Sequence, residues 1–445
     1  MSTAARSSAR AALALIAIAA PIAAPIAAQQ PAAAHDSLTL AALQADALRA
    51  DPRRAQLRLQ ADITALHLRN IAAEEYPALA GTGQAQYQSA VTKIAVPLPG
   101  VSIPTPPHDT YNAYVNAQES LLDPSRAPRR AVERAQLSES QAQVRVALYG
   151  LRQDVNDAFF AALTDQEREA ATQTAIDDLN ARLRETATRF ANGAALPADT
   201  ASIAASILAR RQDLLQIHAD RAAALARLSD LVGHPIGDRA PLSASDAELG
   251  AATNRILDSL LQLRARPEYA QFAATRDRLA EQEAANAAQA KPRVSAFGRV
   301  GYGRPGLNML STNFQSYWLA GLQVDWAPWT WGTLDRERRE LELQRDIVAT
   351  NEASFTETLR RAIRQPVATI AQLDSAIALD DRIIGLRETV ETETRAQLRE
   401  GVVTAAEYVD RYTDLLSARL TRAQHGVARA QARATLLTTL GVEVP

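Results

Sequence analysis

The residue types that most often carry out chemistry in proteins are few in this chain and widely separated. The sequence has no cysteine, so it offers no thiolate nucleophile, disulfide or cysteine-ligated metal site. Its six histidines show no HExxH or other metal-ligand spacing, and no GxSxG nucleophile motif occurs. Gly301-Tyr302-Gly303 is not followed by the helix that a phosphate-binding loop requires. We therefore expect no enzyme, no cofactor and no metal site.

Charge and composition point away from nucleic acid and toward long helices. The formal net charge is −2, from 48 basic and 50 acidic side chains that alternate in sign without a long basic block. A phosphate-neutralising patch is therefore not indicated, and no nucleic-acid partner is expected. Aromatic residues make up only 5% of the 445 residues, and glycine and proline occur in widely spaced clusters. Such a mixture favours long helices over compact α/β units.

The N-terminus has the pattern of a signal peptide. Two early arginines precede an apolar run over residues 11–20, and small residues follow that could be cleaved after Ala28 or Ala34. A single membrane anchor is the alternative, but the run is shorter than the ~20 residues of a spanning helix and ends at Pro21. We predict that residues 1–34 are a signal peptide and that the protein is exported.

The chain contains an internal repeat. Leu48-Arg49-Ala50-Asp51-Pro52 recurs 215 positions later as Leu263-Arg264-Ala265-Arg266-Pro267, and Gly193 recurs 208 positions later as Gly401. Several matches in the same order predict a tandem duplication.

Each half is expected to contain a helix, two strands, a very long helix and a return helix. The predicted units are a first structural repeat over 37–235, a linker over 236–253 in an equatorial region, and a second structural repeat over 254–441. The expected helices span 37–75, with Ser37 as N-cap, 128–191, 198–231, 254–290, 334–400 and 403–440. Pro366 lies inside the second long helix, where it is expected to cause a kink.

The predicted strands have a period of two. One face holds small or apolar residues from Leu79 to Tyr87, and another holds Trp318 to Trp326 in alternate positions. Aromatic residues that border an apolar strand face are typical of the interface girdles of membrane barrels. The predicted membrane-interface aromatics are Tyr111, Tyr114, Tyr317, Trp318 and Trp326. The core of a small β-sandwich is the alternative interpretation.

Geometry indicates that several subunits are needed. The helix predicted over 128–191 would be roughly 95 Å long, too long for a compact single-chain domain. Its apolar stripe must be covered along its whole length by neighbouring helices. Four strands cannot close a barrel, whereas three chains would supply twelve, which is within the range of closed outer-membrane barrels.

The sequence resembles the TolC family of outer-membrane efflux proteins over nearly all of residues 37–441. The most specific matches are the two turn segments at 189–199 and 398–410, each with a glycine followed six residues later by an acidic residue, and the junction Trp329-Thr330-Trp331-Gly332. The resemblance implies a fold that is mainly α with a small β part. It would be a trimeric α-helical coiled-coil barrel joined to a 12-stranded transmembrane β-barrel, with four strands per chain.

The resemblance also implies a function, a location and partners. The chain would be an outer membrane channel with a periplasmic extension, giving a passive exit duct for an efflux pump or a type I secretion system. A periplasmic adaptor protein and an inner-membrane transporter would engage this homotrimer, and the outer membrane lipid bilayer would surround its barrel. The adaptor-contacting helix tips would be at Gly193, Asp199, Gly401 and Thr404. The two glycines are also explained as ordinary helix C-caps.

The same resemblance implies a tunnel-constriction acidic ring at Glu407 and Asp410. These residues are three positions apart on a predicted helix, so they share one face. Three copies around an axis would concentrate negative charge. An ordinary solvated helix face is the alternative.

A periplasmic coiled-coil adaptor or scaffold protein is the other candidate function. An adaptor would have one helical hairpin and barrel-like β-domains, whereas the order predicted for this chain occurs twice. The sequence does not indicate which substrate is transported.

Overall fold

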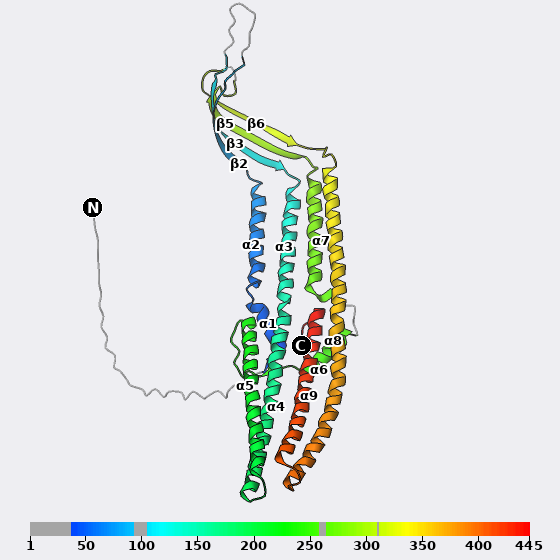
Figure 1. The fold of residues 1–445 in the computed structure, drawn as a ribbon. Coiled ribbons are helices and arrows are strands. Elements are labelled where there is room, and N and C mark those ends of the chain that lie inside the picture. The colour runs from blue at the N-terminus through cyan, green and yellow to red at the C-terminus, as the bar shows by residue number, and fades with distance from the viewer. Residues whose placement is uncertain (1–36, 93–104, 258–263, 309–310) are drawn as a thin grey trace, which may run out of the picture. The chain divides into compact units, whose positions relative to one another are not determined.

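The computed structural model describes residues 37–92, 105–257, 264–308 and 311–445 (Figure 1). The predicted signal peptide, residues 1–34, lies outside the described residues. The helices are α1 (Leu40–Ala50), α2 (Arg54–Ala73), α3 (Arg126–Tyr149), α4 (Leu151–Ala191), α5 (Pro197–Val232), α6 (Asp246–Leu257), α7 (Pro267–Ala288), α8 (Thr333–Arg399) and α9 (Ala405–Leu440). The strands are β1 (Leu38–Thr39), β2 (Ala78–Tyr87), β3 (Asp109–Leu122), β4 (Leu242–Ser243), β5 (Arg293–Arg304) and β6 (Gln315–Asp325).

The same order of elements occurs twice along the chain. A short strand and two helices are followed by two long strands, a long helical rod and a return helix, first in β1 to α5 and again in β4 to α9. The short strands β1 and β4 pair in parallel, with Leu38 opposite Leu242. This order agrees with the order of elements expected from the sequence.

The prediction of one continuous helix over 37–75 is wrong, both in where the helix starts and in that it is continuous. Asp51 leaves the helical region, with ψ of 124°, because Pro52 follows it, and the segment divides into α1 and α2. The N-cap is Thr39 and not Ser37, since the Thr39 hydroxyl accepts a hydrogen bond from the Ala42 amide.

The second half divides in the same way. The helix predicted over 254–290 is two helices, α6 and α7, and Pro267 is the first residue of α7, where proline lacks only an amide that needs no helical partner. The segment 236–253, expected to be a linker, contains β4 and more than half of α6.

The long helices are nearly as predicted. Gly150 separates α3 from α4 but keeps helical angles, with φ of −57° and ψ of −29°, so the two helices form one rod. Helix α8 runs without interruption through Pro366. Within the described residues, none of the helices combines the length and the apolar character needed to cross a bilayer.

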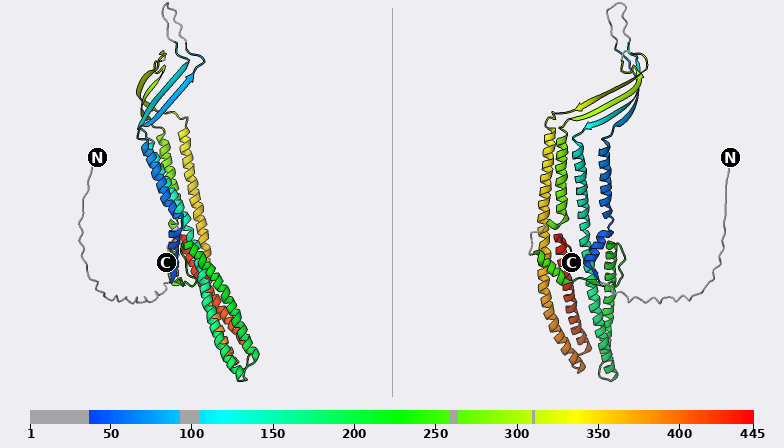
Figure 2. Two further views of the ribbon diagram at one scale, coloured as in Figure 1. Left: turned by 90° about the vertical axis from the view of Figure 1, so that its left-hand side faces the viewer. Right: turned by 180° about the vertical axis from the view of Figure 1, so that it is seen from behind.

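The helices form two levels that continue from one end of the sheet. Helices α2, α3, α7 and the first half of α8 lie side by side next to the sheet, and α5, α4, α9 and the second half of α8 lie further from it (Figures 1 and 2). A large apolar core that includes Leu43, Phe159, Leu228 and Leu437 packs α1, α4, α5, α6 and α9 together. A second core that includes Leu179, Ile203 and Tyr408 lies nearer the hairpin turns.

The sheet is open and entirely antiparallel. Its order is β2-β3-β5-β6, and Val115, Val300 and Trp318 lie opposite one another across three strands. Within the described residues, strands β2 and β6 each have one neighbour, so the sheet has two unpaired edges there.

Candidate functional site

The two faces of the four-stranded sheet differ in chemistry. Residues opposite one another in an antiparallel sheet point to the same side, so the pairing assigns every side chain to a face. One face, here called the apolar face, includes Leu79, Tyr87, Val115, Val300, Tyr302, Trp318, Leu322 and Val324. The other, here called the polar face, includes Thr82, Gln84, Gln86, Asn112, Asn116, Gln118, Arg299 and Gln323.

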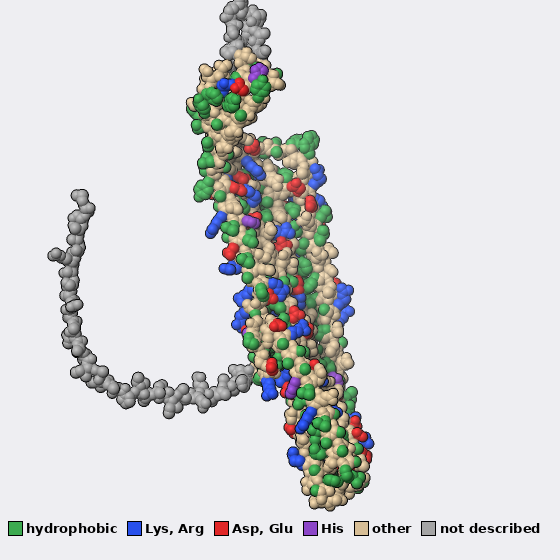
Figure 3. Space-filling view, turned by 60° about the vertical axis from the view of Figure 1, so that its left-hand side comes forward, with side chains coloured by type: hydrophobic (Ala, Val, Ile, Leu, Met, Phe, Trp, Pro, Cys, Tyr) green, Lys and Arg blue, Asp and Glu red, His purple; other side chains and the backbone are tan. Residues whose placement is uncertain are grey.

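The apolar face is uncovered. Its eight large side chains named above are between 55% and 76% exposed. In Figure 3 the charged side chains are concentrated over the helices, and hydrophobic ones predominate over the sheet. A contiguous exposed apolar surface of this extent marks an interaction with a membrane or a protein.

The five predicted interface aromatics divide between these faces. Tyr111 and Trp318 lie on the apolar face. Trp326 follows the end of β6, is 61% exposed, and donates through Nε1 to the Ala290 carbonyl at 3.1 Å. Tyr114 and Tyr317 lie on the polar face, so the five residues do not share one face of the sheet, and their place at a membrane interface stays a prediction.

Local contacts hold the two tyrosines of the polar face. The Tyr317 hydroxyl donates to Asn112 Oδ1 at 2.6 Å, and its ring rests on Gly301, where a Cβ atom would collide with it. The Arg299 guanidinium lies 4.2 Å from the centre of the Tyr114 ring. These rings therefore fill space on the polar side of the sheet.

At the opposite end of the helices, the two hairpins turn through the same backbone motif. Gly193 and Gly401 have φ of 74° and 73°, the left-handed region in which glycine is favoured. The Ala194 amide donates to the Arg189 carbonyl at 2.8 Å, and the Val402 amide donates to the Gln397 carbonyl at 2.9 Å. Both turns are Schellman motifs that satisfy the last carbonyls of α4 and α8.

Asp199 joins the two turns. Its Oδ2 accepts from the Leu196 amide at 2.9 Å, which caps α5, and its Oδ1 accepts from the Ala405 amide at 3.1 Å, which caps α9 of the other hairpin. A carboxylate at two helix N-termini is stabilised by both helix dipoles. Thr404 caps α9 locally, since its Oγ1 accepts from the Glu407 amide at 3.3 Å.

Arg189 makes a second hydrogen-bonded contact between the two hairpin turns. Its Nη1 donates to the Leu398 carbonyl at the end of α8, at 2.6 Å, and its Nη2 donates to Ala194 O at 3.4 Å. Sequence reasoning missed this residue, because its partner is 209 positions away and nothing in the local pattern distinguishes it from other surface arginines. The four predicted tip residues thus lie together, and Arg189 lies among them.

Further from the turns, two tyrosines of α9 hold this helix to α8 and α4 through their hydroxyl groups. The buried Tyr408 hydroxyl donates to Glu391 Oε1 at 2.9 Å, and Arg395 binds the same carboxylate. The Tyr412 hydroxyl donates to Asp178 Oδ2 on α4 at 3.0 Å. Burial, together with the Glu391 carboxylate, raises the pKa of Tyr408 to about 12.

The predicted acidic pair lies on the outside of the subunit. Glu407 and Asp410 are both exposed, while Tyr408 between them is buried. Within the part of the chain that is described, neither carboxylate has a hydrogen bond or ion pair from a side chain. The two residues share one helix face, and the ring that they were predicted to form remains a prediction.

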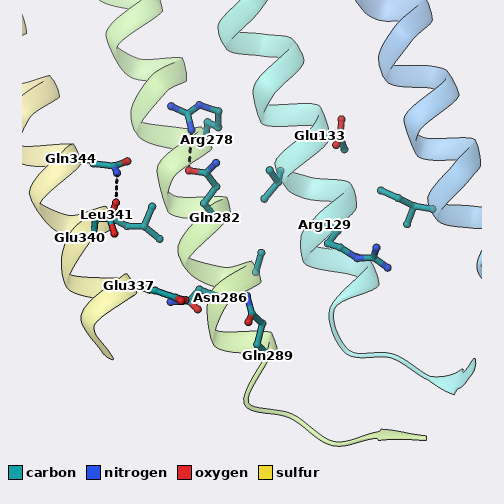
Figure 4. Close-up of a pocket in the computed structure, with 13 residues that line it drawn as sticks. Arg129, Glu133, Arg278, Gln282, Asn286, Gln289, Glu337, Glu340, Leu341 and Gln344 are labelled. Atoms are coloured by element: carbon teal, nitrogen blue, oxygen red, sulfur yellow. Dashed lines mark hydrogen bonds between the residues drawn. The ribbon is translucent and has the colours of Figure 1, made fainter. Parts of the chain in front are cut away.

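A polar cleft that sequence reasoning did not find crosses the level next to the sheet. It has a volume of about 630 Å³ and is lined by Ile71 of α2 together with residues of α3, α7 and α8, among them Arg129, Gln282, Asn286 and Glu337 (Figure 4). All four helices of this level therefore border the cleft.

The cleft has uncompensated acceptors on α8. Arg278 is held by Glu139 and Gln282. Glu337 has no side-chain partner among the described residues, and Glu340 accepts only from Gln344, at 3.2 Å. Both carboxylates are exposed, so the cleft offers hydrogen-bond acceptors to solvent. In the described parts of the chain, no three histidine, aspartate or glutamate residues are grouped so that they could hold a metal ion.

Comparison with known proteins gives a fold. No protein-family model matches the chain, and no curated protein matches it significantly. Three crystal structures of similar proteins cover almost the whole chain.

The first is CusC, studied for the conformational changes accompanying folding and transmembrane channel formation, with a TM-score of 0.62, 15% identity, and coverage of 91% of this chain and 92% of that one. VceC, an outer membrane protein of Vibrio cholerae, gives a TM-score of 0.60 and 16% identity over 91% of this chain and 96% of its own. The open-state outer membrane channel MtrE of Neisseria gonorrhoeae gives a TM-score of 0.61 and 18% identity, over 91% of this chain and 89% of its own. The resemblance to TolC-family channels that the sequence indicates is thus confirmed at the level of the fold.

Proposed function

We propose that this chain is the subunit of an outer membrane channel of the TolC type, a passive exit duct for an efflux pump or a type I secretion system. The observation that carries the proposal is the open sheet, which has an uncovered apolar face, a polar face and two unpaired edges. In lipid, unpaired backbone groups at a sheet edge cost several kcal/mol each, so such a sheet is stable there only when it is closed.

Strand direction supports closure by identical copies. The strands alternate in direction from β2 to β6, so β6 of one copy and β2 of the next would again be antiparallel. Three copies of four strands give twelve strands, an even number within the range of outer membrane barrels. The apolar face would contact lipid, and the polar face would line the interior.

The helical edges support the same assembly. At one edge, α2 exposes Leu59, Ile63 and Leu66, which are 50–56% exposed and lie on one helix face. At the other edge, α8 exposes Leu343 and Ile347 at the level of α2, and Leu386 in its second half. A heterologous interface between the two edges, repeated around an axis, buries both and closes a homotrimeric tunnel.

The remaining assignments are further parts of the same proposal. The polar cleft would form part of the tunnel wall, and three copies of Glu407 and Asp410 would form an acidic ring at the narrow end. The joined tips, with Gly193, Asp199, Gly401 and Thr404, would meet a periplasmic adaptor that links the channel to an inner-membrane transporter. Residues 1–34 would direct export, and a tandem duplication of one half would account for the repeated order of elements.

Disulfide cross-linking tests the closure directly, because the native chain has no cysteine. Single cysteines are placed on the polar face along β2, for example Thr82→Cys, and on the same face along β6, for example Leu319→Cys, and then combined in one chain. If the edges meet, some pairs cross-link between chains, and the ladder of products ends at the trimer. The single variants are the control. Failure of every pair to cross-link in membranes would contradict the proposal.

Ion conductance tests the duct. The purified protein is expected to form stable, cation-preferring pores in planar bilayers. A protein that is monomeric in membranes and inactive in this assay would favour the scaffold function.

A further inference from the structure

A pocket with an arginine rim lies where the two helical levels meet. It has a volume of about 580 Å³ and is bordered by the end of α1, the start of α2, the junction of α3 with α4, residues Ala265 and Pro267, and the C-terminal segment. Leu48, Leu57 and Leu148 form apolar wall, and Arg54 and Arg145 line the same space.

The positive charge of this pocket is only partly balanced. Arg49 pairs with Asp46, but Arg54 and Arg145 have no ion pair or side-chain hydrogen bond among the described residues. Just before α2, the Asp51 carboxylate accepts from the Arg53 amide at 2.7 Å and pairs with the Arg53 guanidinium, so its charge is not free to balance Arg54. The pocket therefore has an excess of two guanidinium groups over carboxylates.

Arg152 provides a third cation whose partner is easily replaced. Its side chain is 14% exposed and its Nε has no acceptor. Its one carboxylate partner is Glu443, at 3.1 Å, whose side chain is 86% exposed. An ion pair with so exposed a carboxylate contributes little, so an incoming anion can take its place.

The floor of the pocket is rigid and aromatic. The Tyr149 hydroxyl donates to the Thr438 carbonyl at 2.6 Å, and the guanidinium of Arg266 lies 4.6 Å from the centre of its ring. These contacts fix the ring beside Leu148, and together they offer an apolar surface next to unpaired cations.

We propose that this pocket binds a small organic anion, with a carboxylate or phosphate group on an apolar body. The charged group would lie between Arg54, Arg145 and Arg152, and the apolar body against the leucines and Tyr149. Charge-assisted bonds from guanidinium groups to such oxyanions are the strong ones in proteins, and the apolar wall distinguishes this class from inorganic anions.

The position of the pocket favours a soluble ligand over a membrane lipid. The 24 residues of α3 separate it from the sheet by roughly 36 Å of helix at the standard rise. A lipid held in a bilayer around the sheet does not reach that far. The inference is independent of the channel function, because ligand binding is measured on the protein itself.

Calorimetric titration of the full assembly in nanodiscs of zwitterionic lipid tests the site. The probe is 4-butylbenzoate, the neutral control ligand is 4-butylbenzamide, and empty nanodiscs are the blank. We expect saturable binding of the benzoate and at least about tenfold weaker binding of the amide and of inorganic phosphate.

Matched variants locate the site. Arg54→Gln and Arg145→Gln are each expected to weaken benzoate binding by about fivefold to tenfold. Arg58→Gln, an exposed arginine one turn further along α2 that does not line the pocket, is expected to leave it unchanged. Glu443→Gln is expected to strengthen binding, and because Glu443 is exposed its substitution does not disturb the fold.

Four results would overturn the proposal. They are the absence of saturable binding to the native assembly, equal binding of benzoate and amide, equal loss in all three arginine variants, and no gain in Glu443→Gln.

Discussion

Replacing Asp199 by Asn isolates the contact between the two hairpin turns. The asparagine keeps one side-chain oxygen, which can remain on the Leu196 amide and cap α5. It places an NH2 group where Oδ1 now accepts from the Ala405 amide of α9. The substitution therefore removes the bond between hairpins and the negative charge, while the local cap and the side-chain volume are retained.

The expected size of the effect follows from the kind of bond. A hydrogen bond to a charged group contributes about 1.5–3 kcal/mol, and partial exposure of this site lowers that to about 1–2 kcal/mol. Since 1.4 kcal/mol corresponds to a factor of ten, the Ala405 amide should exchange its hydrogen about fivefold to thirtyfold faster. Hydrogen-exchange mass spectrometry on peptides that cover residues 401–409 measures this.

A second measurement reports the separation of the turns. Nitroxide labels on Asn192→Cys and Glu400→Cys, the only cysteines in the chain, give the distance distribution between the two hairpins. Asp199→Asn should broaden it and move it to longer distances. The control is Thr404→Ala, which removes the Thr404 bond to the Glu407 amide and no bond between hairpins. An unchanged rate of hydrogen exchange at the Ala405 amide, or an equal shift of the distance distribution in Thr404→Ala, would refute the reasoning.

Three further outcomes are expected. Gly301→Ala should displace the Tyr317 ring and cost about 1–3 kcal/mol of stability, seen as a lower temperature of heat dissociation on gels. Because the pKa of Tyr408 is raised to about 12, the contribution of this tyrosine to stability is complete below pH 10 and is lost as the pH rises toward 12. Between pH 10 and 12, thermal denaturation should therefore show a smaller loss of stability for Tyr408→Phe than for the native protein. The double variant Glu407→Gln, Asp410→Asn should reduce the cation preference measured from reversal potentials in planar bilayers.

Two of these predictions have a matched control variant, and the third has a result that would contradict it. Gly298→Ala has open space around its added Cβ and should leave heat dissociation unchanged. A Tyr408→Phe variant with the same alkaline loss as the native protein would contradict the assignment to this tyrosine. Glu393→Gln removes an exposed acidic charge of α8 and should leave the ion preference as it is; an unaltered preference in the double variant would remove the ring.

The sequence predicted the elements well where periodicity decides them. The alternation from Leu79 to Tyr87 and from Trp318 to Val324 gave the correct faces of β2 and β6, because a strand has a strict period of two. The helix boundaries at Asp51 and Arg266 were missed, because the apolar period continues on both sides of the break and hides the effect of the following proline.

The sites depended on contacts that no local pattern contains. Asp199 was found from the resemblance, but its bond to Ala405 joins residues 206 positions apart. The arginine-rimmed pocket draws on Arg54, Arg145 and Glu443, from three distant segments. Side chains of this kind look like ordinary surface charges until the fold brings them together.

The 67 residues of α8 have a mechanical consequence. This helix joins the end of β6 to the turn at Gly401 as one piece, roughly 100 Å long at the standard rise. An axial push at the turn can therefore reach the sheet through one helix, whereas its partners α7 and α9 are two helices that meet where Arg266 donates to the Thr439 carbonyl. Pro366 is the central residue of α8 and lacks the amide that would bridge one turn there, so bending concentrates at the midpoint. Bending of α8 at Pro366 would move its outer half, with the turn at Gly401 and the packed helix α9, relative to the half beside the sheet.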